Sequence, residues 1–562
     1  MSAASASQPP SPQSGTLKSP RVCLNCRRKK KACDKGLPSC SRCIESRQVC
    51  LHEDDVGGSS TPGSHRFSPI MGQYVSPMME QHLVGGSHHQ PGWSTLSPSL
   101  FASMDSVEDI HSFIFRCLSE IAESRQGVEL AVSSYFADVN TWFTIIERAT
   151  FERQLEDMWV NPSAETGVLV LCMRLITRSP IANPISGMGD RHYLSAKTML
   201  NLVQSKVPAF SIQLLQAELL VALYECSHGM PQQAYMSVGN CCQMSRALGW
   251  HNKAFWSLEQ QSLGPRQLKM CSILWWAIVY VDCLVHVGYQ DQKYPLHTTN
   301  FTPSPSDFSI PFPEALDRYL PGSLAFSFHQ GHQGFLLDAE LAQIDGLVWP
   351  EANSAGYLRT VLQQLSPSNP SSSPPTIAER NSITELIMGH TINLLAGKRT
   401  AAVGANFIAL MKINHAGLLV NAHPHRSGSS AGIPGTSASS SATASDLRPI
   451  ETIRSVIDSV YSEAHQQQQA LAAATASMSS GGGSGSATPS LRSWAPCGAF
   501  AAYYAALLLI SHGDGVLRDQ EWLIKVEGLK KTLEIGCRRW KVAEKYLEGV
   551  NIALSNRLGY TG

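Results

Sequence analysis

Apolar side chains recur every three or four residues over long stretches of this chain, and strict apolar/polar alternation is scarce. The first stretch opens near Ser106 and keeps one face apolar through Val107, Ile110, Ile114, Cys117, Leu118 and Ile121. Such spacing is typical of an amphipathic helix. Further apolar segments of helix length lie at about 163–178, 211–227, 233–249, 266–287, 378–396 and 401–420. The pattern predicts one large α-helical domain over 106–420.

Segments poor in apolar residues surround and interrupt this domain. Residues 1–20 are rich in Ser, Pro and Ala, and residues 53–105 in Gly, Ser, Pro and His. We expect both to be disordered, the second as a linker, because they cannot bury enough apolar surface to fold. Low-complexity sequence returns over 421–493 as an insertion, within which 451–474 could form an isolated helix. Residues 494–562 are expected to form an apolar helix over 494–512 and one mixed-charge helix at about 519–555, and to pack back onto the large domain.

Neither secretion nor a membrane span is indicated. The N-terminus lacks the charged and apolar regions of a secretory signal. The longest apolar runs, Ile273–Val281 and Ala499–Ile510, are shorter than the ~20 apolar residues that a membrane span needs. We therefore expect no membrane and an intracellular protein, in which thiols stay reduced.

Charge is concentrated near the N-terminus. The whole chain of 562 residues has 44 basic and 44 acidic residues and a net charge of zero. Residues 18–50 alone hold ten Lys and Arg against Asp34 and Glu45, a local net charge of +8. A small basic module on a mildly acidic body is typical of a protein that meets a polyanion at one end.

The same basic segment holds six of the fifteen cysteines, at Cys23, Cys26, Cys33, Cys40, Cys43 and Cys50. Their spacing, C-x2-C-x6-C, repeats after 17 residues. A zinc ion takes four thiolates at about 2.3 Å, so six thiols hold two ions only if two of them bridge. The repeat nominates its equivalent first members, Cys23 and Cys40, as the bridges. The alternatives are a disulfide knot, or one four-thiolate site with two spare cysteines.

This segment resembles the DNA-binding module of the fungal binuclear zinc-cluster transcription factors with six cysteines. The resemblance rests on the cysteine spacing, the basic run "RRKKK" after the second cysteine, Asp34 and Pro38. It implies a mostly α protein in which a metal-stabilised cluster of two Zn(II) ions, over 21–52, precedes the all-helical domain. It also implies double-stranded DNA as the partner and the nucleus as the location.

Each half of the repeat is expected to place a short helix after its C-x2-C, and only the first, with "RRKKK", suits DNA. The resemblance implies recognition of a CGG-type triplet in the major groove, with base contacts from Lys29 and Lys30. Phosphate contacts would come from Arg27, Arg28 and Lys31. Ala32 stands where the family often has a basic residue, which puts one DNA-backbone contact in doubt.

The helical body resembles the family's regulatory middle-homology domain over 135–155, 214–250 and 273–289. The resemblance implies a regulatory role with the transcription machinery as partner, and it leaves room for a small-molecule effector. Members commonly dimerise through a coiled coil after the cluster, but 53–105 has no sustained apolar heptads. A monomer and a homodimer formed through the helical domain both remain open.

Catalytic motifs are not found in the sequence. Gly397–Thr400, "GKRT", lacks the spacing of a phosphate loop, and neither G-x-S-x-G nor H-E-x-x-H occurs. Cys241, Cys242 and Cys283 lie in apolar runs and are expected to be buried structural thiols.

We therefore predict a zinc-dependent, sequence-specific transcription factor of RNA polymerase II genes, not an enzyme, with no catalytic residues and no organic cofactor. An activator is favoured, and a pathway-specific role, for example in secondary metabolism, would suit the family. The alternatives are a repressor, or a metabolite-binding or enzymatic helical protein with an incidental basic zinc module.

Overall fold

The computed structural model describes residues 26, 29, 31–35, 40–45, 107–122, 124–178, 191–256, 263–288, 295–299, 301, 310, 311, 313, 351–366, 375–396, 400–422, 444–479 and 495–559. The chain divides into two compact units, Met1–Pro91 and Gly92–Gly562. Every regular element among the described residues is helical, which confirms the mostly α prediction. The stretches expected to be disordered, 1–20 and 53–105, lie outside these residues.

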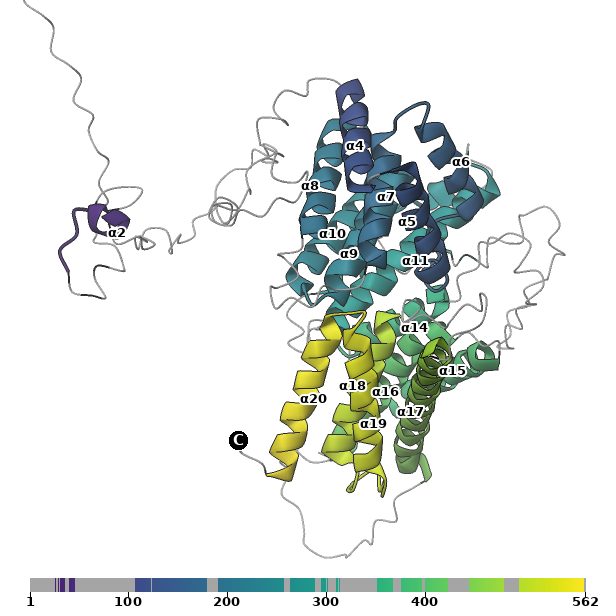
Figure 1. Cartoon of the computed structure of the whole chain (residues 1–562). Helices are drawn as coiled ribbons and strands as arrows, with labels where there is room; N and C mark the ends of the chain where they lie inside the picture. The colour runs from purple at the N-terminus through teal and green to yellow at the C-terminus, as the bar shows by residue number, and fades with distance from the viewer. Residues whose placement is uncertain are drawn as a thin grey trace, which may run out of the picture. The chain divides into compact units, whose positions relative to one another are not determined.

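The first helices of the large unit form a bundle (Figure 1). In chain order they are α4 (Val107–Ala122), α5 (Arg125–Asp138), α6 (Arg148–Met158), α7 (Ala164–Thr177), α8 (Arg191–Lys206), α9 (Ile212–Ser227), α10 (Pro231–Ala247), the 3-10 turn η4 (Lys253–Trp256) and α11 (Pro265–Gly288). The predicted apolar face of α4 is buried through Ile110, Ile114 and Leu118. Helix α9 packs against α7, α10 and α11 at the centre of this bundle.

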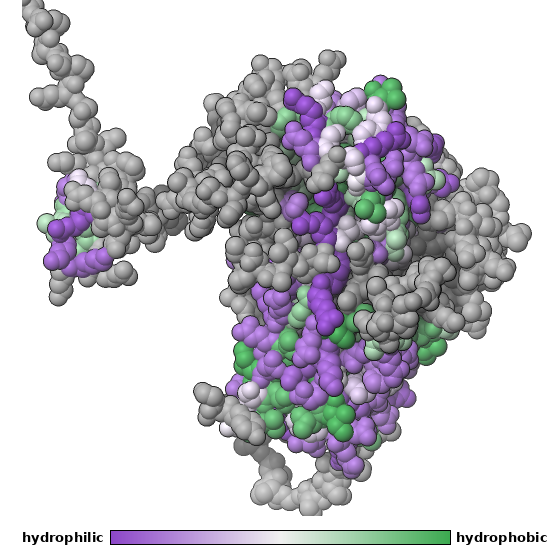
Figure 2. Space-filling view, viewed as in Figure 1, coloured by the Kyte–Doolittle hydropathy of each residue, from purple (hydrophilic) through white to green (hydrophobic). Residues whose placement is uncertain are grey.

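The later helices form a second bundle, which α14 joins to α11 (Figure 1). They are α14 (Glu351–Gln364), α15 (Ile377–Ala396), α16 (Thr400–Ala422), α17 (Ala444–Ser479), α18 (Pro496–His512), α19 (Trp522–Cys537) and α20 (Val542–Leu558). Helix α16 is central, since α14, α15, α17 and α18 all pack on it. In Figure 2 patches of hydrophobic residues interrupt the hydrophilic face of this region.

Local signals explain where several helices begin. The side chains of Ser124, Ser163 and Ser211 accept hydrogen bonds from backbone N–H groups at the starts of α5, α7 and α9. Such N-caps satisfy N–H groups that have no partner within the helix. Gly249, just after α10, has φ of 83°, a left-handed conformation that favours glycine. It ends the helix and turns the chain toward Trp250.

Two expectations for the C-terminal third need correction. The helix expected at 451–474 spans Ala444–Ser479, and it is not isolated, because Ile453, Val456 and Ile457 are buried against the core. The mixed-charge segment read as one helix forms two, α19 and α20, separated at a turn where Trp540 is fully buried. Hydrophobic periodicity did not reveal either feature, because it does not show which other helices an apolar face packs against.

Helix α11 corrects the expectation that no segment is long enough to span a membrane. Residues Arg266–Gly288 have the length and apolar composition of a span, with a mean hydropathy of 1.8. However, 89% of that window is buried inside the protein. Core helices of folded domains are often apolar on all sides, and α11 packs against α9, α10 and α14.

Candidate metal centre and nucleic-acid interface

Three of the predicted metal ligands converge in the small unit. The Sγ atoms of Cys26, Cys33 and Cys40 all lie within 4.8 Å of one another. Cys26 and Cys40 are buried, with Sγ atoms 3.8 Å apart, and Cys43 is buried beside them. The remaining predicted ligands, Cys23 and Cys50, lie outside the described residues.

This arrangement fits zinc. Tetrahedral thiolates at ~2.3 Å from an ion are about 3.8 Å from one another, which is the separation of the Cys26 and Cys40 sulfurs. The Cys26 and Cys40 sulfurs, 3.8 Å apart, are also much farther from each other than the ~2.05 Å of a disulfide bond. Cys26, Cys33 and Cys40 are also three of the four ligands that the repeat assigns to the first ion, with Cys23 as the fourth.

A carboxylate organises the second half of the module. Asp34 accepts hydrogen bonds from the backbone N–H of Ser41, at 3.0 and 3.2 Å, and from its hydroxyl at 2.6 Å. Ser41 opens α2 (Ser41–Glu45), so Asp34 caps this helix from seven residues away. The helix starts directly after Cys40, earlier than expected, and includes Cys43. The sequence marked Asp34 as a family residue but not as a cap.

The basic run is only partly described. Lys29 and Lys31 have exposed side chains, and the backbone N–H of Lys31 donates to the carbonyl oxygen of Cys26 at 3.0 Å. This bond closes a turn between Cys26 and Lys31. Arg27, Arg28 and Lys30 lie outside the described residues.

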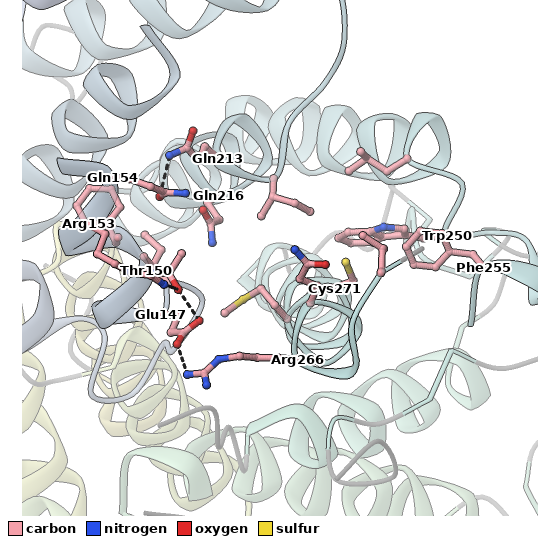
Figure 3. A pocket seen from close by; sticks show the side chains of 17 residues that line it. Glu147, Thr150, Arg153, Gln154, Gln213, Gln216, Trp250, Phe255, Arg266 and Cys271 are labelled. Carbon is pink, nitrogen blue, oxygen red and sulfur yellow. Dashed lines mark hydrogen bonds and ion pairs between the residues drawn. The ribbon is translucent and has the colours of Figure 1, made fainter. Parts of the chain in front are cut away.

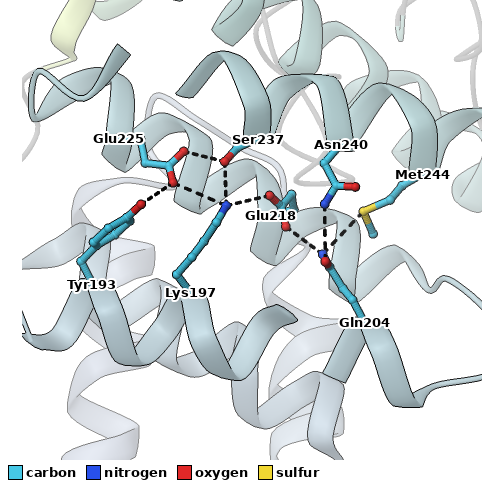
Figure 4. Close-up of polar contacts among 8 residues, drawn as sticks. All are labelled: Tyr193, Lys197, Gln204, Glu218, Glu225, Ser237, Asn240 and Met244. Carbon is cyan, nitrogen blue, oxygen red and sulfur yellow. Dashed lines mark hydrogen bonds and ion pairs between the residues drawn. The ribbon is translucent and has the colours of Figure 1, made fainter. Parts of the chain in front are cut away.

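The helical unit contains a buried polar network that the sequence did not reveal (Figure 4). Lys197 on α8 donates to the carboxylate of Glu218 at 3.0 Å and to the hydroxyl of Ser237 at 2.7 Å, and it lies 3.4 Å from Glu225. Tyr193 and Ser237 donate to Glu225 at 2.7 and 2.6 Å. Both carboxylates are on α9 and are almost completely buried.

Two almost completely buried carboxylates therefore share one ammonium. Burial raises the pKa of Glu225, although Lys197 and two hydroxyl donors oppose that effect. The two carboxylates raise the pKa of Lys197 despite its own desolvation. Since every group of the network lies on α8, α9 or α10, its evident role is to fix the packing of these three helices.

Three cysteines and one aspartate of the body are buried in its core. Burial raises the pKa values of the Cys241, Cys242 and Cys283 thiols well above the ordinary value, so none is a reactive thiolate. Asp282 accepts hydrogen bonds from the N–H and hydroxyl of Thr298, at 2.9 and 2.8 Å. Asp282 thereby ties α11 to the segment around Thr298.

Two known domains match this chain. Residues 21–55 match the fungal Zn(2)-Cys(6) binuclear cluster domain, and residues 132–335 match the fungal specific transcription factor domain. The first match contains all six cysteines of the repeat. The second begins in α5 and continues beyond α11. No solved structure matches the chain.

Similar proteins are also transcription factors by name. Transcription factor BOA15 of Botryotinia fuckeliana is 28% identical over 158 residues, which cover 28% of this chain and 86% of that protein. Oleate activated transcription factor 3 of Kluyveromyces lactis is 51% identical over 35 residues, or 6% of this chain and 5% of that protein. An uncharacterized transcriptional regulatory protein of Schizosaccharomyces pombe is 21% identical over 305 residues, 52% of this chain and 42% of that protein.

These matches agree with the cysteine geometry and with the helical body, and they confirm the resemblance seen in the sequence. The chain matches the two domains of the fungal zinc-cluster transcription factors, and it is similar to a protein named as a transcription factor.

Proposed function

We propose that this transcription factor holds two Zn(II) ions through Cys23, Cys26, Cys33, Cys40, Cys43 and Cys50, and that Cys23 and Cys40 bridge them. The convergence of three sulfurs at zinc spacing carries this proposal. Structural zinc would replace the apolar core that so short a segment lacks. It would thereby hold the basic run in one conformation.

The proposed target is a CGG-type triplet in double-stranded DNA. Lys29 and Lys30 would donate to guanine O6 and N7, and Arg27, Arg28 and Lys31 would contact phosphates. The local charge of +8 and the exposure of Lys29 and Lys31 support this assignment. Since its proposed target is DNA, the protein would be located in the nucleus, where it would act, without enzymatic activity, as an activator of RNA polymerase II genes.

Fluorescence anisotropy tests the base-reading assignment. The full chain is titrated against a CGG duplex and against a duplex in which the triplet is scrambled. Lys30→Ala should weaken binding to the CGG duplex by ~1–3 kcal/mol and hardly affect the scrambled duplex. Arg42→Ala, on α2 in the other half-repeat, is the matched control and should change both little. Equal losses on the two duplexes would refute base reading by Lys30.

Metal analysis tests the cluster independently. Purified protein should contain two zinc ions per chain, and a strong chelator should abolish DNA binding. Cys26→Ser should lose metal, whereas Cys537→Ser, at the end of α19, should retain it. A metal content of one ion per chain would reject the bridged cluster in favour of a single four-thiolate site.

We further propose that 106–420 forms the regulatory domain, followed by the 421–493 insertion, with residues 494–562 packed onto it. The contacts of α18 with α16 and of Arg539 with Ile176 support the packing of the C-terminal residues on this domain. The domain would present or restrain activation function toward the transcription machinery and respond to a small-molecule effector.

A homodimer without a coiled coil would form through the regulatory domain, and sedimentation with and without a two-site duplex tests this. A reporter gene separates the activator from the alternative repressor.

A further inference from the structure

The helical unit contains a cavity of about 540 Å³. The roles proposed for the metal centre and the basic run do not involve this cavity. Its walls come from α6, α9, the turn after α10 with η4, and the start of α11 (Figure 3). A volume of this size lies within the ~300–1,000 Å³ typical of sites for small organic ligands.

One wall is apolar and firmly held. Leu248, Trp250, Phe255 and Met270 line it. The rings of Trp250 and Phe255 lie 6.4 Å apart. The backbone oxygen of Trp250 accepts a hydrogen bond from the indole N–H of Trp256 at 2.8 Å, which fixes the turn that carries both rings. Flat apolar side chains in a fixed position favour an apolar or aromatic ligand.

The opposite wall carries neutral amides. Gln213 on α9 donates to the side-chain oxygen of Gln154 on α6 at 3.0 Å, and to Thr166 at 3.1 Å. Gln216, one turn after Gln213, is buried and donates to the carbonyl oxygen of Ile145 at 2.7 Å. These bonds hold the three amides in place. Their other N–H and C=O groups can serve carbonyl or hydroxyl groups of a ligand.

The charged groups at the rim already have partners within the protein. Arg266 donates to the carboxylate of Glu147, whose second oxygen accepts from the hydroxyl of Thr150 at 2.9 Å. Arg153 is exposed and donates to the backbone of Ala149 and to Thr150. A charged ligand would have to compete with these contacts, whereas an uncharged ligand leaves them intact.

We propose that this cavity binds an uncharged, mainly apolar small molecule with carbonyl or hydroxyl groups along one edge. Its rings or chains pack on Trp250 and Phe255, and its polar edge meets Gln154, Gln213 and Gln216. The site deepens the proposed function by giving the effector a place and a chemical class. A regulatory role of the bound ligand rests on that function, whereas its binding to the cavity does not.

The position of the cavity explains how binding can be transmitted. Helix α6 packs mainly on α7, whereas α9 and α11 belong to the centre of the bundle. A ligand in the cavity touches α6 on one side and α11 on the other. Binding therefore adds a contact that joins α6 to the central helices and restrains its movement.

Titration of the full chain with Nile red, an uncharged apolar dye with a carbonyl group, tests the site. Met270→Trp places a large ring in the cavity and should weaken dye binding by about tenfold. Met236→Trp makes the same substitution on the exposed face of α10, outside the cavity, and should leave it unchanged. Phe255→Ala removes part of the apolar wall without filling space and should also weaken binding. Circular dichroism checks that each variant is folded.

Native-like dye binding by folded Met270→Trp and Phe255→Ala would overturn the site, and if Met270→Trp does not fold, Phe255→Ala decides. An equal loss in Met236→Trp would also overturn it. Tighter binding of the anionic dye 1-anilinonaphthalene-8-sulfonate than of Nile red would refute the uncharged class. The DNA titration is a separate readout, so failure to bind CGG duplexes with normal dye binding would reject the proposed DNA target but not the cavity.

Discussion

Arg539 donates a hydrogen bond to the backbone oxygen of Ile176 at 2.6 Å, across 363 positions of the chain. The same guanidinium donates to the backbone oxygen of Arg178 at 3.2 Å and lies 3.9 Å from the ring centre of Trp540. The carbonyl groups at the end of a helix have no partner within it. A charged side chain from the turn between α19 and α20 therefore completes the end of α7 and ties the C-terminal helices to the first bundle.

Replacing this cap should destabilise the whole helical unit. Arg539 is 1% exposed, so Arg539→Met leaves the buried carbonyl oxygen of Ile176 and the partly buried one of Arg178 without their donor and should cost about 2–4 kcal/mol. Arg538→Met, the same change at the exposed neighbouring position, should cost less than about 0.5 kcal/mol. Urea unfolding measures both. Similar costs for the two variants would contradict the capping role.

The cap on α2 should matter for zinc retention. Asp34→Asn keeps the shape of the side chain but loses the charge that accepts three contacts from Ser41. The loss should destabilise the cluster by about 1 kcal/mol, so zinc should pass to a colorimetric chelator several-fold faster than from the native protein. Thermal unfolding of the helical unit serves as the control and should not change. A native rate of zinc release would show that α2 does not need this cap.

Salt dependence should separate phosphate contacts from base contacts. Lys31→Ala should weaken binding to CGG and scrambled duplexes alike, because phosphates carry no sequence information. It should also reduce the slope of log affinity against log salt by about 1. Anisotropy over a range of salt concentrations provides the slope. Selective loss on the CGG duplex alone would instead place Lys31 against a base.

The buried network predicts an asymmetric response to mutation. Lys197→Met removes the ammonium and leaves Glu218 and Glu225 buried together, which should cost about 3–5 kcal/mol. The double variant Lys197→Met/Glu225→Gln removes one charge of each sign and should be more stable than Lys197→Met alone. Denaturant unfolding of both variants tests the order. A double variant that is no better than the single would show that the two carboxylates do not strain the core.

Acid should destabilise the helical unit partly through His228. Burial, with Arg539 and Lys541 nearby, lowers the pKa of His228 from 6.5 to about 3. Below pH 6.5 this histidine becomes protonated in the unfolded chain but not in the native protein. The free energy of unfolding therefore falls as the pH decreases from 6.5 to about 3. At pH 5 this one group should account for a loss of about 2 kcal/mol.

The variant His228→Phe tests this, since it retains stacking on Tyr224, whose ring centre lies 4.0 Å away. It should lose less stability than the native protein between pH 7 and pH 5. Partial burial also lowers the pKa of His390, to about 4, so part of the acid sensitivity should remain. If His228→Phe loses as much stability between pH 7 and pH 5 as the native protein, His228 does not contribute to the acid sensitivity.

The helical periodicity located α4, α7, α9, α10, α11, α15, α16 and α18 to within a few residues, because each has a long apolar face. Among the helices that the structure describes, it did not locate α5, α6, α8 and α14. Their apolar residues are fewer or are mixed with Gln, Ser and charged side chains, as at Lys197 and Gln204. Such polar residues lie inside only because partners on other helices satisfy them, and no single segment reveals those partners.

The sequence by itself determined the resemblance to the fungal zinc-cluster transcription factors and the candidate metal centre, because the cysteines of a zinc cluster lie close together along the chain and their spacing is specific to such a cluster. The bridging role of Cys23 and Cys40 remains a prediction from that spacing. Only the tertiary structure decided which distant groups meet: Arg539 with Ile176, Lys197 with two carboxylates of α9, and α6 with α11 around a cavity. Such contacts depend on how helices pack, and packing is a property of the whole core rather than of any local pattern.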